Sequence, residues 1–550
     1  MVESRKKRLG NDRSQPAKNN EEDSKPDELK PPPLFSIPSL PQWELALYFA
    51  VWIGHSAFAF YRVYDISGER HSALSRLYRW VSPSWLTPWT GLQRDQTNFE
   101  WNEWIRFGQL WLPWMAGHSL VFNLCHSELI PSRRLGKALY FAFSMISHVA
   151  LYQAAPVFAL VVLSPVMIFL ARKTSSVIPV WVCCFAFLYY TYSNPSFGGS
   201  ASSPAGYRAT VLLMYKCLQI IGYCGRLTED SEEQSTSFVQ NCVDFANFAA
   251  YMPYSNMLIV LYEDYSRQMS LRDTKPFDAF FILKATARLV FWASFAELML
   301  HLFYFNSFMS DKTLISRVGL VSLCSAGYVA GQFFQVKYVV IFGACALFAH
   351  IDRLEPPHLP ICISRVTLYS RMWRHFDVGL YQFLKTRLYV PIMKATNPPP
   401  GKAGNAALRW LLRLGSLVSC YGFVVFWHGT DARHTTWIAL NCSEVLIEKL
   451  AMGLYLFLLG TTAGSALSEA ISLANQRRIL AWLQNLCIAL GIFGIFYFLG
   501  EEGVGSVFTE QIWFQNGRYL NFVFWYLTTL GYCYNQCNLE WEKRFPLRGL

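Results

Sequence analysis

The feature that most constrains this chain is a series of apolar runs that recurs over most of its length. A transmembrane helix needs about 20 apolar residues, although tilted or re-entrant segments use other lengths. Charged residues make up only 15% of the chain, against about 25% in ordinary soluble domains. We therefore predict an all-α polytopic membrane protein with ten to thirteen transmembrane or re-entrant helices around a central cavity. The runs lie at about 43–63, 107–125, 137–152, 154–171, 177–193, 208–225, 238–262, 278–306, 317–350, 407–427, 436–460, 480–499 and 517–536.

The first 42 residues differ from the rest of the chain. They are polar and of mixed charge, and they end in the Pro-rich piece 31–33. Such a composition cannot bury a core, so we expect a disordered tail. Basic residues at 5–8 place this tail in the cytoplasm. No cleavable signal peptide is visible, so the first apolar run would act as a signal-anchor. Residues 43–550 are predicted to form a single polytopic domain.

Composition also excludes several classes of function. In a membrane protein, a net charge of +11 mainly reflects basic residues in the loops, which set the topology. No zinc-finger or helix-turn-helix signature in the sequence indicates nucleic-acid binding. A basic rim suits anionic headgroups or a phosphate-rich substrate. Most of the 14 cysteines lie within apolar runs and are predicted to be small core residues. Walker, Rossmann and Gly-x-Ser-x-Gly motifs are absent from the sequence.

Two segments are too polar for simple spans. Residues 64–105 are rich in Trp, Ser and Pro, and an amphipathic piece around Trp80 is expected at the membrane interface. Residues 351–406 contain several prolines and many basic groups. This second segment predicts short helices that line a cavity or lie on a surface. In the run 278–306, Glu297 and His301 are four residues apart and predict a polar pair on one helix face rather than a metal site.

Asp377 lies near the start, and His428 near the end, of the stretch from Arg371 to Gly429, which mixes basic, aromatic and apolar residues. A carboxylate in the setting of Asp377 needs a partner, and an ion pair with Arg374, one helical turn earlier, is the structural explanation. His428 ends an apolar run, where it either caps a helix or, held neutral by burial, accepts a proton. A buried ionisable group in a membrane protein is a functional-site hypothesis. From the residues alone, both explanations stay open at both positions.

Several motifs together resemble one family. They are Arg371-Met372-Trp373-Arg374-His375-Phe376-Asp377-Val378-Gly379-Leu380, Leu388-Tyr389-Val390-Pro391, Phe426-Trp427-His428-Gly429, Pro356-Pro357-His358-Leu359-Pro360-Ile361-Cys362 and the start Leu40-Pro41-Gln42-Trp43-Glu44. From about residue 40 to the C-terminus, the chain resembles the hedgehog acyltransferases, which belong to the membrane-bound O-acyltransferase superfamily and share its fold.

The resemblance implies a multi-pass enzyme of the endoplasmic reticulum, with the Golgi as a second compartment. Such an enzyme transfers palmitate from palmitoyl-CoA to the N-terminal cysteine amine of a hedgehog-type secreted protein, within membrane lipid and without nucleic acid. The family's catalytic residues map onto His428 and Asp377. Its substrate-binding residues map onto Trp373 and Arg374 near the acyl-CoA, and onto Asn441. Its haem b ligand maps onto Cys362, as a thiolate on the iron.

The sequence also departs from the family pattern. Ile392-Met393-Lys394 follows Pro391 where the family often has Gly-Gly-Ser, and Asn256-Met257-Leu258 stands where it has Asn-Gly-Pro. Besides Arg374, the basic residues Arg371, Lys385 and Arg387 are expected near the CoA phosphates. Two other functions remain. One is a lipid O-acyltransferase of the same superfamily, acting on a glycerolipid or sterol hydroxyl, and the other is a non-enzymatic membrane scaffold that binds lipidated partners.

Overall fold

The structure is a computed structural model that describes residues 38–68, 81–130, 132–194, 203–229, 236–365, 367–395, 406–514 and 522–545. The predicted tail therefore lies outside the described residues up to residue 37, and so does Trp80.

The described chain is almost entirely helical, which confirms the all-α prediction. The exception is a pair of two-residue antiparallel strands, β1 (Val81–Ser82) and β2 (Arg94–Asp95). The helices are α1 Gln42–Ser67, α3 Thr87–Thr90, α4 Phe99–Cys125, α5 Arg133–Tyr152, α6 Ala154–Thr174, α7 Ile178–Ser193, α8 Pro204–Glu229, α10 Phe238–Ala250, α11 Tyr262–Leu271, α12 Ala279–Leu302, α13 Phe305–Met309, α14 Lys312–Arg317, α15 Leu320–Ile351, α16 Tyr369–Phe376, α17 Val378–Leu384, α18 Val390–Ala395, α19 Ala406–His428, α20 Ala432–Leu459, α21 Thr462–Ala470, α22 Leu473–Leu499, α23 Val504–Trp513 and α24 Phe522–Arg544.

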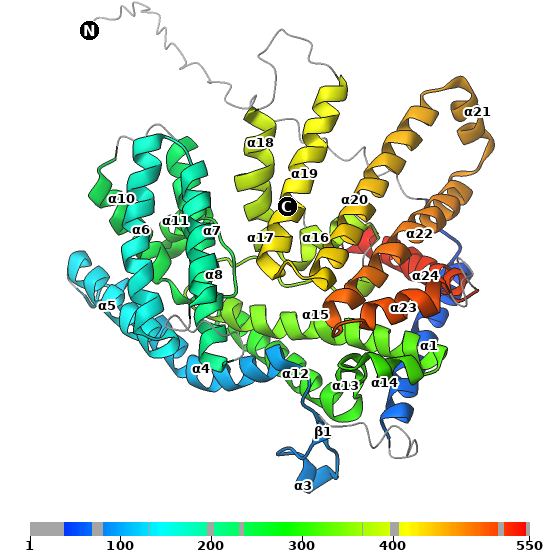
Figure 1. The fold of residues 1–550 in the computed structure, drawn as a ribbon, viewed down its shortest axis with the longest axis horizontal. Helices are drawn as coiled ribbons and strands as arrows, with labels where there is room; N and C mark the ends of the chain where they lie inside the picture. The colour runs from blue at the N-terminus through cyan, green and yellow to red at the C-terminus, as the bar shows by residue number, and fades with distance from the viewer. Residues whose placement is uncertain are drawn as a thin grey trace, which may run out of the picture.

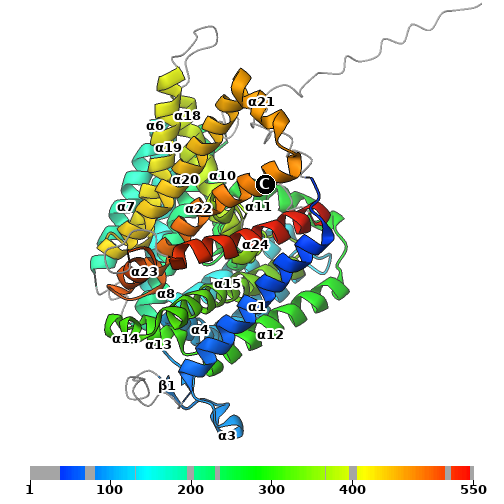
Figure 2. The same cartoon turned by 90° about the vertical axis from the view of Figure 1, so that its right-hand side faces the viewer.

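Helix α15 organises the bundle. It is one continuous helix of 32 residues, so the predicted run 317–350 is a single long helix and not two short ones. In Figure 1 it crosses the middle of the molecule, with α4–α8 towards one end and α1, α13, α14 and α23 towards the other. Figure 2 shows α1 and α12 running alongside it, and both helices pack against it. Residues on most of its faces are buried, as expected for a helix that is apolar all round.

Several helices are long and apolar enough to cross a membrane. Within the described residues there are five, namely α6, α12, α15, the part of α19 from Trp410 to His428, and α22. The bent pair α20 and α21 makes a sixth if it is counted as one span. Other long helices, such as α1, α4 and α24, carry more polar residues, so the total of ten to thirteen segments stays a prediction. The chain is a multi-pass membrane protein.

The predicted run 238–262 is interrupted in the structure. Helix α10 ends at Ala250, and residues 251–261 form a buried loop with one 3-10 turn at Met252–Tyr254. Non-helical backbone within a membrane protein needs internal hydrogen-bond partners. Gln219 of α8 supplies one by donating from Nε2 to the Tyr254 carbonyl at 2.8 Å. Ser255 Oγ donates to the Tyr251 carbonyl at 3.0 Å and accepts from the buried Lys216 of α8 at 2.9 Å. Periodicity alone missed this break, although Pro253 marks it.

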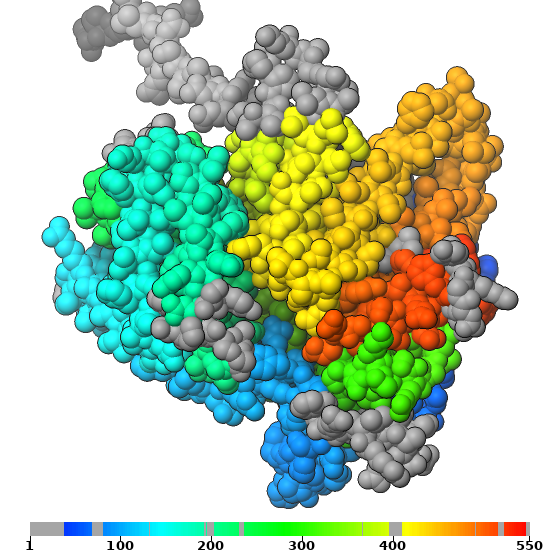
Figure 3. Space-filling view, viewed as in Figure 1, coloured from blue at the N-terminus to red at the C-terminus, as the bar shows by residue number. Residues whose placement is uncertain are grey.

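The segment 351–406 forms short helices, as predicted. Helices α16 and α17 are followed by a π-helical turn at Lys385–Tyr389 and by α18. Figure 3 shows α18 and α19 filling the space between the α6–α7 side and the α20–α22 side of the molecule. At the junction between α16 and α17, Val378 and Gly379 are buried, so this junction lies inside the bundle, where a site can form.

Candidate active site

Asp377 lies at the junction between α16 and α17. It follows the last residue of α16, and its Oδ1 accepts a hydrogen bond from the backbone N–H of Leu380 at 2.9 Å, so it is the N-cap of α17. Among the described residues no ion pair joins it to Arg374, so the helical ion pair expected from the spacing is wrong. The reason is that α16 ends before Asp377, while the exposed Arg374 turns its guanidinium over the ring of Tyr381, 5.9 Å from the centroid.

The backbone beside Asp377 is held by close packing. A Cβ on Gly379 would lie 2.1 Å from the carbonyl oxygen of Ile259 in the 251–261 loop. Only glycine allows this approach, which seats the first turn of α17 against the loop. Burial raises the pKa of the Asp377 carboxyl to about 6, although backbone N–H groups of Leu380 and Gly379 oppose the shift. The loop thus fixes the position of a carboxylate that titrates near neutral pH.

His428 is in the last turn of α19 and is half-buried. Its ring centroid lies 5.1 Å from that of Trp437 and 5.2 Å from that of Phe498, both in edge-on contacts. Gly429 follows with a φ of 124°, which ends the helix. Beyond it, His434 is 6.4 Å from His428 between ring centroids. The imidazole is therefore held by aromatic rings at a helix end.

A chain of aromatic contacts joins the surroundings of Asp377 to those of His428. Phe376, which precedes Asp377, stacks on Phe334 of α15 with centroids 5.2 Å apart. Phe334 lies 5.8 Å from Phe498, whose ring in turn contacts His428. These contacts define one region that runs from the C-terminal end of α16 across α15 and α22 to His428 at the end of α19.

Trp373 belongs to the same region. Its ring packs against Tyr421 of α19 at 5.5 Å and against Trp437 of α20 at 6.1 Å. Asn441 is buried one turn after Trp437; it donates to the Trp437 carbonyl at 2.5 Å and accepts from the hydroxyl of Tyr369. Asn441 therefore holds Trp437 and the start of α16 in place, and it affects the site indirectly, through these two contacts.

The structure adds a carboxylate that lies in the polar segment 64–105 and was not predicted to be near the site. Glu100, in the first turn of α4, pairs with Lys337 and accepts a hydrogen bond from Tyr338 Oη at 3.0 Å. Tyr338 in turn packs against Phe376 with ring centroids 5.7 Å apart, so Glu100 borders the same region. One signal was available, because Lys337 is the sole Lys, Arg, Asp or Glu between Leu320 and Ile351 and a cation there requires an acidic partner.

The basic residues expected near CoA differ in their surroundings. Arg371 pairs with Glu542 at 2.7 Å. Arg387 is buried and pairs with Glu263. Both of these arginines are already paired with a carboxylate of the protein, whereas Arg374 is exposed. Arg374 is therefore the better placed of these three arginines for an incoming phosphate.

Cys362 is half-buried in the loop between α15 and α16. Its neighbour Ile361 donates its backbone N–H to the carbonyl of His375 in α16 at 3.3 Å. Arg365, three residues after Cys362, stacks on Trp541 at 5.8 Å and has a buried Nε with no hydrogen-bond partner among the described residues. Within the described residues no group of three or more His, Cys, Asp or Glu could hold a bare metal ion. The Cys362 thiol and the Arg365 Nε are the groups that could serve a haem here, as a thiolate ligand and as a donor to a haem carboxylate.

Comparisons with known proteins agree with this architecture. The chain is 27% identical to the protein-cysteine N-palmitoyltransferase HHAT of Mus musculus over 523 residues, which is 92% of this chain and 100% of the relative. It is also 27% identical to the protein-cysteine N-palmitoyltransferase Rasp of Drosophila melanogaster, over 54% of this chain and 55% of the relative. A third relative, the HHAT-like protein of Mus musculus, is 23% identical over 75% of this chain and 80% of its own. Residues 164–471, more than half of the chain, match the membrane-bound O-acyltransferase family. The chain belongs to the membrane-bound O-acyltransferase family.

Proposed function

We propose that this protein is a protein-cysteine N-palmitoyltransferase that moves palmitate from palmitoyl-CoA to the N-terminal cysteine of a hedgehog-type secreted protein. The observation that carries the proposal is the chain of ring contacts through Phe376, Phe334 and Phe498, which connects the residue before Asp377 to His428. The names of the two relatives with 27% identity supply the acyl group and the acceptor. We also propose that the protein works in the endoplasmic-reticulum membrane, with the Golgi as the second compartment, as the family resemblance of the sequence implies.

The chemistry assigns one task to each residue. The acceptor amine has an unperturbed pKa of roughly 7.7–8.0 and attacks the thioester carbonyl. A C–N bond forms, the C–S bond breaks, and CoA leaves as the thiolate. Neutral His428 accepts the proton that the amine loses and passes it to the CoA sulfur, and general-base help of this kind is worth about 10²–10⁴ in rate. Ionised Asp377 orients the amine and offsets its charge.

The remaining residues serve the donor. Arg374 offers an exposed guanidinium to the CoA phosphates. Trp373, packed between Tyr421 and Trp437, borders the acyl chain. Asn441 is a positioning residue that holds Trp437 in place. Orientation of donor and acceptor in one site can contribute more than proton transfer does, about 7–11 kcal/mol of the barrier.

The proposal is tested by His428→Ala and Asp377→Asn in the purified full-length protein. His428→Ala is expected to lose at least about 10²-fold in kcat, the lower limit of general acid–base help. Asp377→Asn is expected to lose about 10²-fold, the cost of a poorly oriented reacting group, and both variants should keep their elution volume and Tm. His350→Ala, also in the last turn of a helix, and Asp278→Asn, also an N-cap, are matched controls that should retain activity. Near-normal palmitoylation of an N-terminal-cysteine peptide by both site variants would overturn the assignment.

The acceptor is tested with labelled palmitoyl-CoA and three alternatives, a Cys-Gly peptide, a lysolipid and a sterol. Labelling of the peptide at its α-amine supports the proposal. Labelling of the lysolipid or sterol instead identifies a lipid O-acyltransferase. Absence of turnover with all three, together with retained binding of a lipidated peptide, identifies a scaffold.

We also propose that Cys362 ligates haem b, with Arg365 as a partner for its carboxylates. Acyl transfer needs no electron transfer, so the bound haem would act as a structural anchor for the loop between α15 and α16. The purified protein should show a thiolate-type Soret band that is lost in Cys362→Ala. Cys242→Ala, another half-buried cysteine, is the control, and an unchanged band in Cys362→Ala contradicts the assignment.

A further inference from the structure

A short hairpin stands out from the helical body. Strands β1 and β2 pair through Val81 with Asp95 and Ser82 with Arg94, and α3 forms the tip between them. Figure 1 and Figure 3 show this blue segment projecting from the lower edge of the molecule. The proposed acyl transfer gives this hairpin no role.

The tip of the hairpin has an unusual surface. Residues 81–93 contain no Asp, Glu, Lys or Arg. Trp85 and Trp89 are 72% and 85% exposed, respectively. An indole combines a large apolar ring with an N–H donor. Two exposed tryptophans on an uncharged tip therefore indicate an environment that is partly apolar and partly hydrated.

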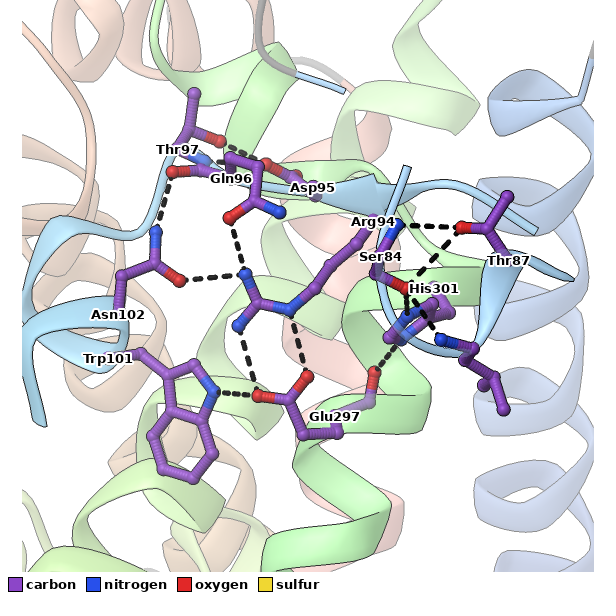
Figure 4. A network of polar contacts seen from close by, with 11 residues as sticks. Ser84, Thr87, Arg94, Asp95, Gln96, Thr97, Trp101, Asn102, Glu297 and His301 are labelled. Atoms are coloured by element: carbon purple, nitrogen blue, oxygen red, sulfur yellow. Dashed lines mark hydrogen bonds and ion pairs between the residues drawn. The ribbon is translucent and has the colours of Figure 1, made fainter. Parts of the chain in front are cut away.

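The base of the hairpin is fixed to α12. Figure 4 shows the Arg94 guanidinium donating twice to Glu297, with Nε to Oε2 at 2.8 Å and Nη2 to Oε1 at 3.0 Å. Trp101 Nε1 donates to the same carboxylate at 2.7 Å, and Ser84 Oγ lies 2.7 Å from His301 Nε2. Glu297 and His301, predicted to be a polar pair on one helix face, are thus the anchor points. A bidentate ion pair with little exposure leaves the hairpin little freedom.

The anchor points lie at the end of a membrane span. Helix α12 has 24 residues, a length of about 36 Å at 1.5 Å per residue, and the hydrocarbon core is about 30 Å thick. Its flanks face outward, with Phe280, Leu283 and Phe291 exposed. Glu297 and His301 lie in its last two turns, so the hairpin leaves the protein where α12 reaches the lipid headgroups.

We propose that the hairpin tip, through Trp85 and Trp89, inserts into the headgroup layer of the leaflet at which α12 ends. Tryptophan is enriched at this depth in membrane proteins. The absence of charge on residues 81–93 favours zwitterionic lipid, because anionic lipid is recognised by clustered Lys and Arg. Since β2 leads directly into α4, the anchor also holds Glu100 and the neighbouring candidate site at a fixed depth.

The test uses the full-length protein, labelled with 5-fluorotryptophan and reconstituted in phosphatidylcholine nanodiscs. Trp85→Phe and Trp89→Phe assign the two fluorine resonances, and the buried Trp101, assigned in the same way, is the internal control. We expect headgroup-spin-labelled lipid to remove most of the Trp85 and Trp89 intensity. An aqueous gadolinium chelate should leave most of it.

The opposite pattern overturns the proposal. Strong broadening by the aqueous chelate, with little effect of the spin-labelled lipid, places the tip in solvent. If the acceptor protein then shields the two resonances from the chelate, the hairpin is a protein-docking element and not a lipid anchor. Both readouts are independent of acyl transfer, so they stand or fall separately from the proposed function.

Discussion

The side chain of Asp377 has both a structural role and a proposed chemical role. It caps α17 through the Leu380 N–H and lies in the region that contains His428. Asparagine caps a helix about as well as aspartate does, so Asp377→Asn separates the charge from the cap. Burial raises the pKa of the carboxyl from 3.8 to about 6, which means that its ionised form is costly in the folded protein.

A pH dependence follows from this pKa. The carboxylate is needed in its charged form, so kcat at saturating substrate should fall as the pH drops below about 6. The folded state binds this proton more tightly than the unfolded state, so this group lowers stability as the pH rises from about 4 to about 6. Asp377→Asn should therefore be at least as thermostable as the natural protein above pH 6. A kcat that stays constant down to about pH 5 would contradict the first expectation, and a clear fall in Tm the second.

At the scale of secondary-structure elements, the contact between α17 and the 251–261 loop sets the position of Asp377. Gly379 allows the contact, and the loop is in turn held by Lys216 through Ser255. None of these residues needs to touch substrate. A displacement of the carboxylate by about 1 Å can cost roughly 10²-fold in rate, so this packing matters for activity as well as for stability.

Gly379→Ala tests that contact. The added methyl group would overlap the Ile259 carbonyl, so we expect a loss of about 1–3 kcal/mol in stability from overpacking and at least a tenfold fall in kcat. Gly415→Ala in α19 is the control, because a Cβ there meets nothing within 4 Å. Thermal unfolding and palmitoylation assays on both variants measure the difference. Equal activity in the two variants would show that α17 tolerates the shift.

At the scale of the whole molecule, the first described helix is bound to the last ones. Arg477 of α22 is buried; it pairs with Glu540 of α24 at 2.5 Å and donates to the Pro38 carbonyl, just before α1, at 2.7 Å. Glu44 of α1 pairs with Arg478 at 2.6 Å. These contacts join parts of the chain that are more than 400 residues apart, so the two ends of the described chain form one body with the bundle.

Arg477→Met should therefore weaken the whole assembly. Breaking a buried ion pair costs about 3–5 kcal/mol. We expect the lower end of this range, because Glu540 keeps its pair with Lys543 while Gln536 and the Pro38 carbonyl lose their donor. The exposed pair Arg267–Asp264 provides the matched control, and Arg267→Met should cost no more than about 1 kcal/mol. Intrinsic-fluorescence melting in one detergent compares the two. If both variants melt together, the contact between α22 and α24 does not limit stability.

Much of this arrangement could be predicted from the sequence. Low charge and recurring apolar runs specify a helical membrane protein, because such segments satisfy their own backbone hydrogen bonds. The polar stretch 351–406 predicted the short helices on which Asp377 lies. Residues that interact only across the bundle were missed. The pairing of Glu100 with Lys337 joins positions 237 residues apart, and neither lies near Asp377 or His428 in the sequence.

The sequence by itself determined the class of fold, the family resemblance and the two ionisable residues most in need of explanation. Local patterns suffice for these, because hydropathy and motif residues are properties of short segments. Only the tertiary structure decided that Asp377 caps α17 instead of pairing with Arg374, and that an aromatic chain leads from its neighbour to His428. It also decided that Glu297 and His301 anchor a tryptophan hairpin. These outcomes depend on where helices end and which side chains meet across the bundle, and long-range packing sets both.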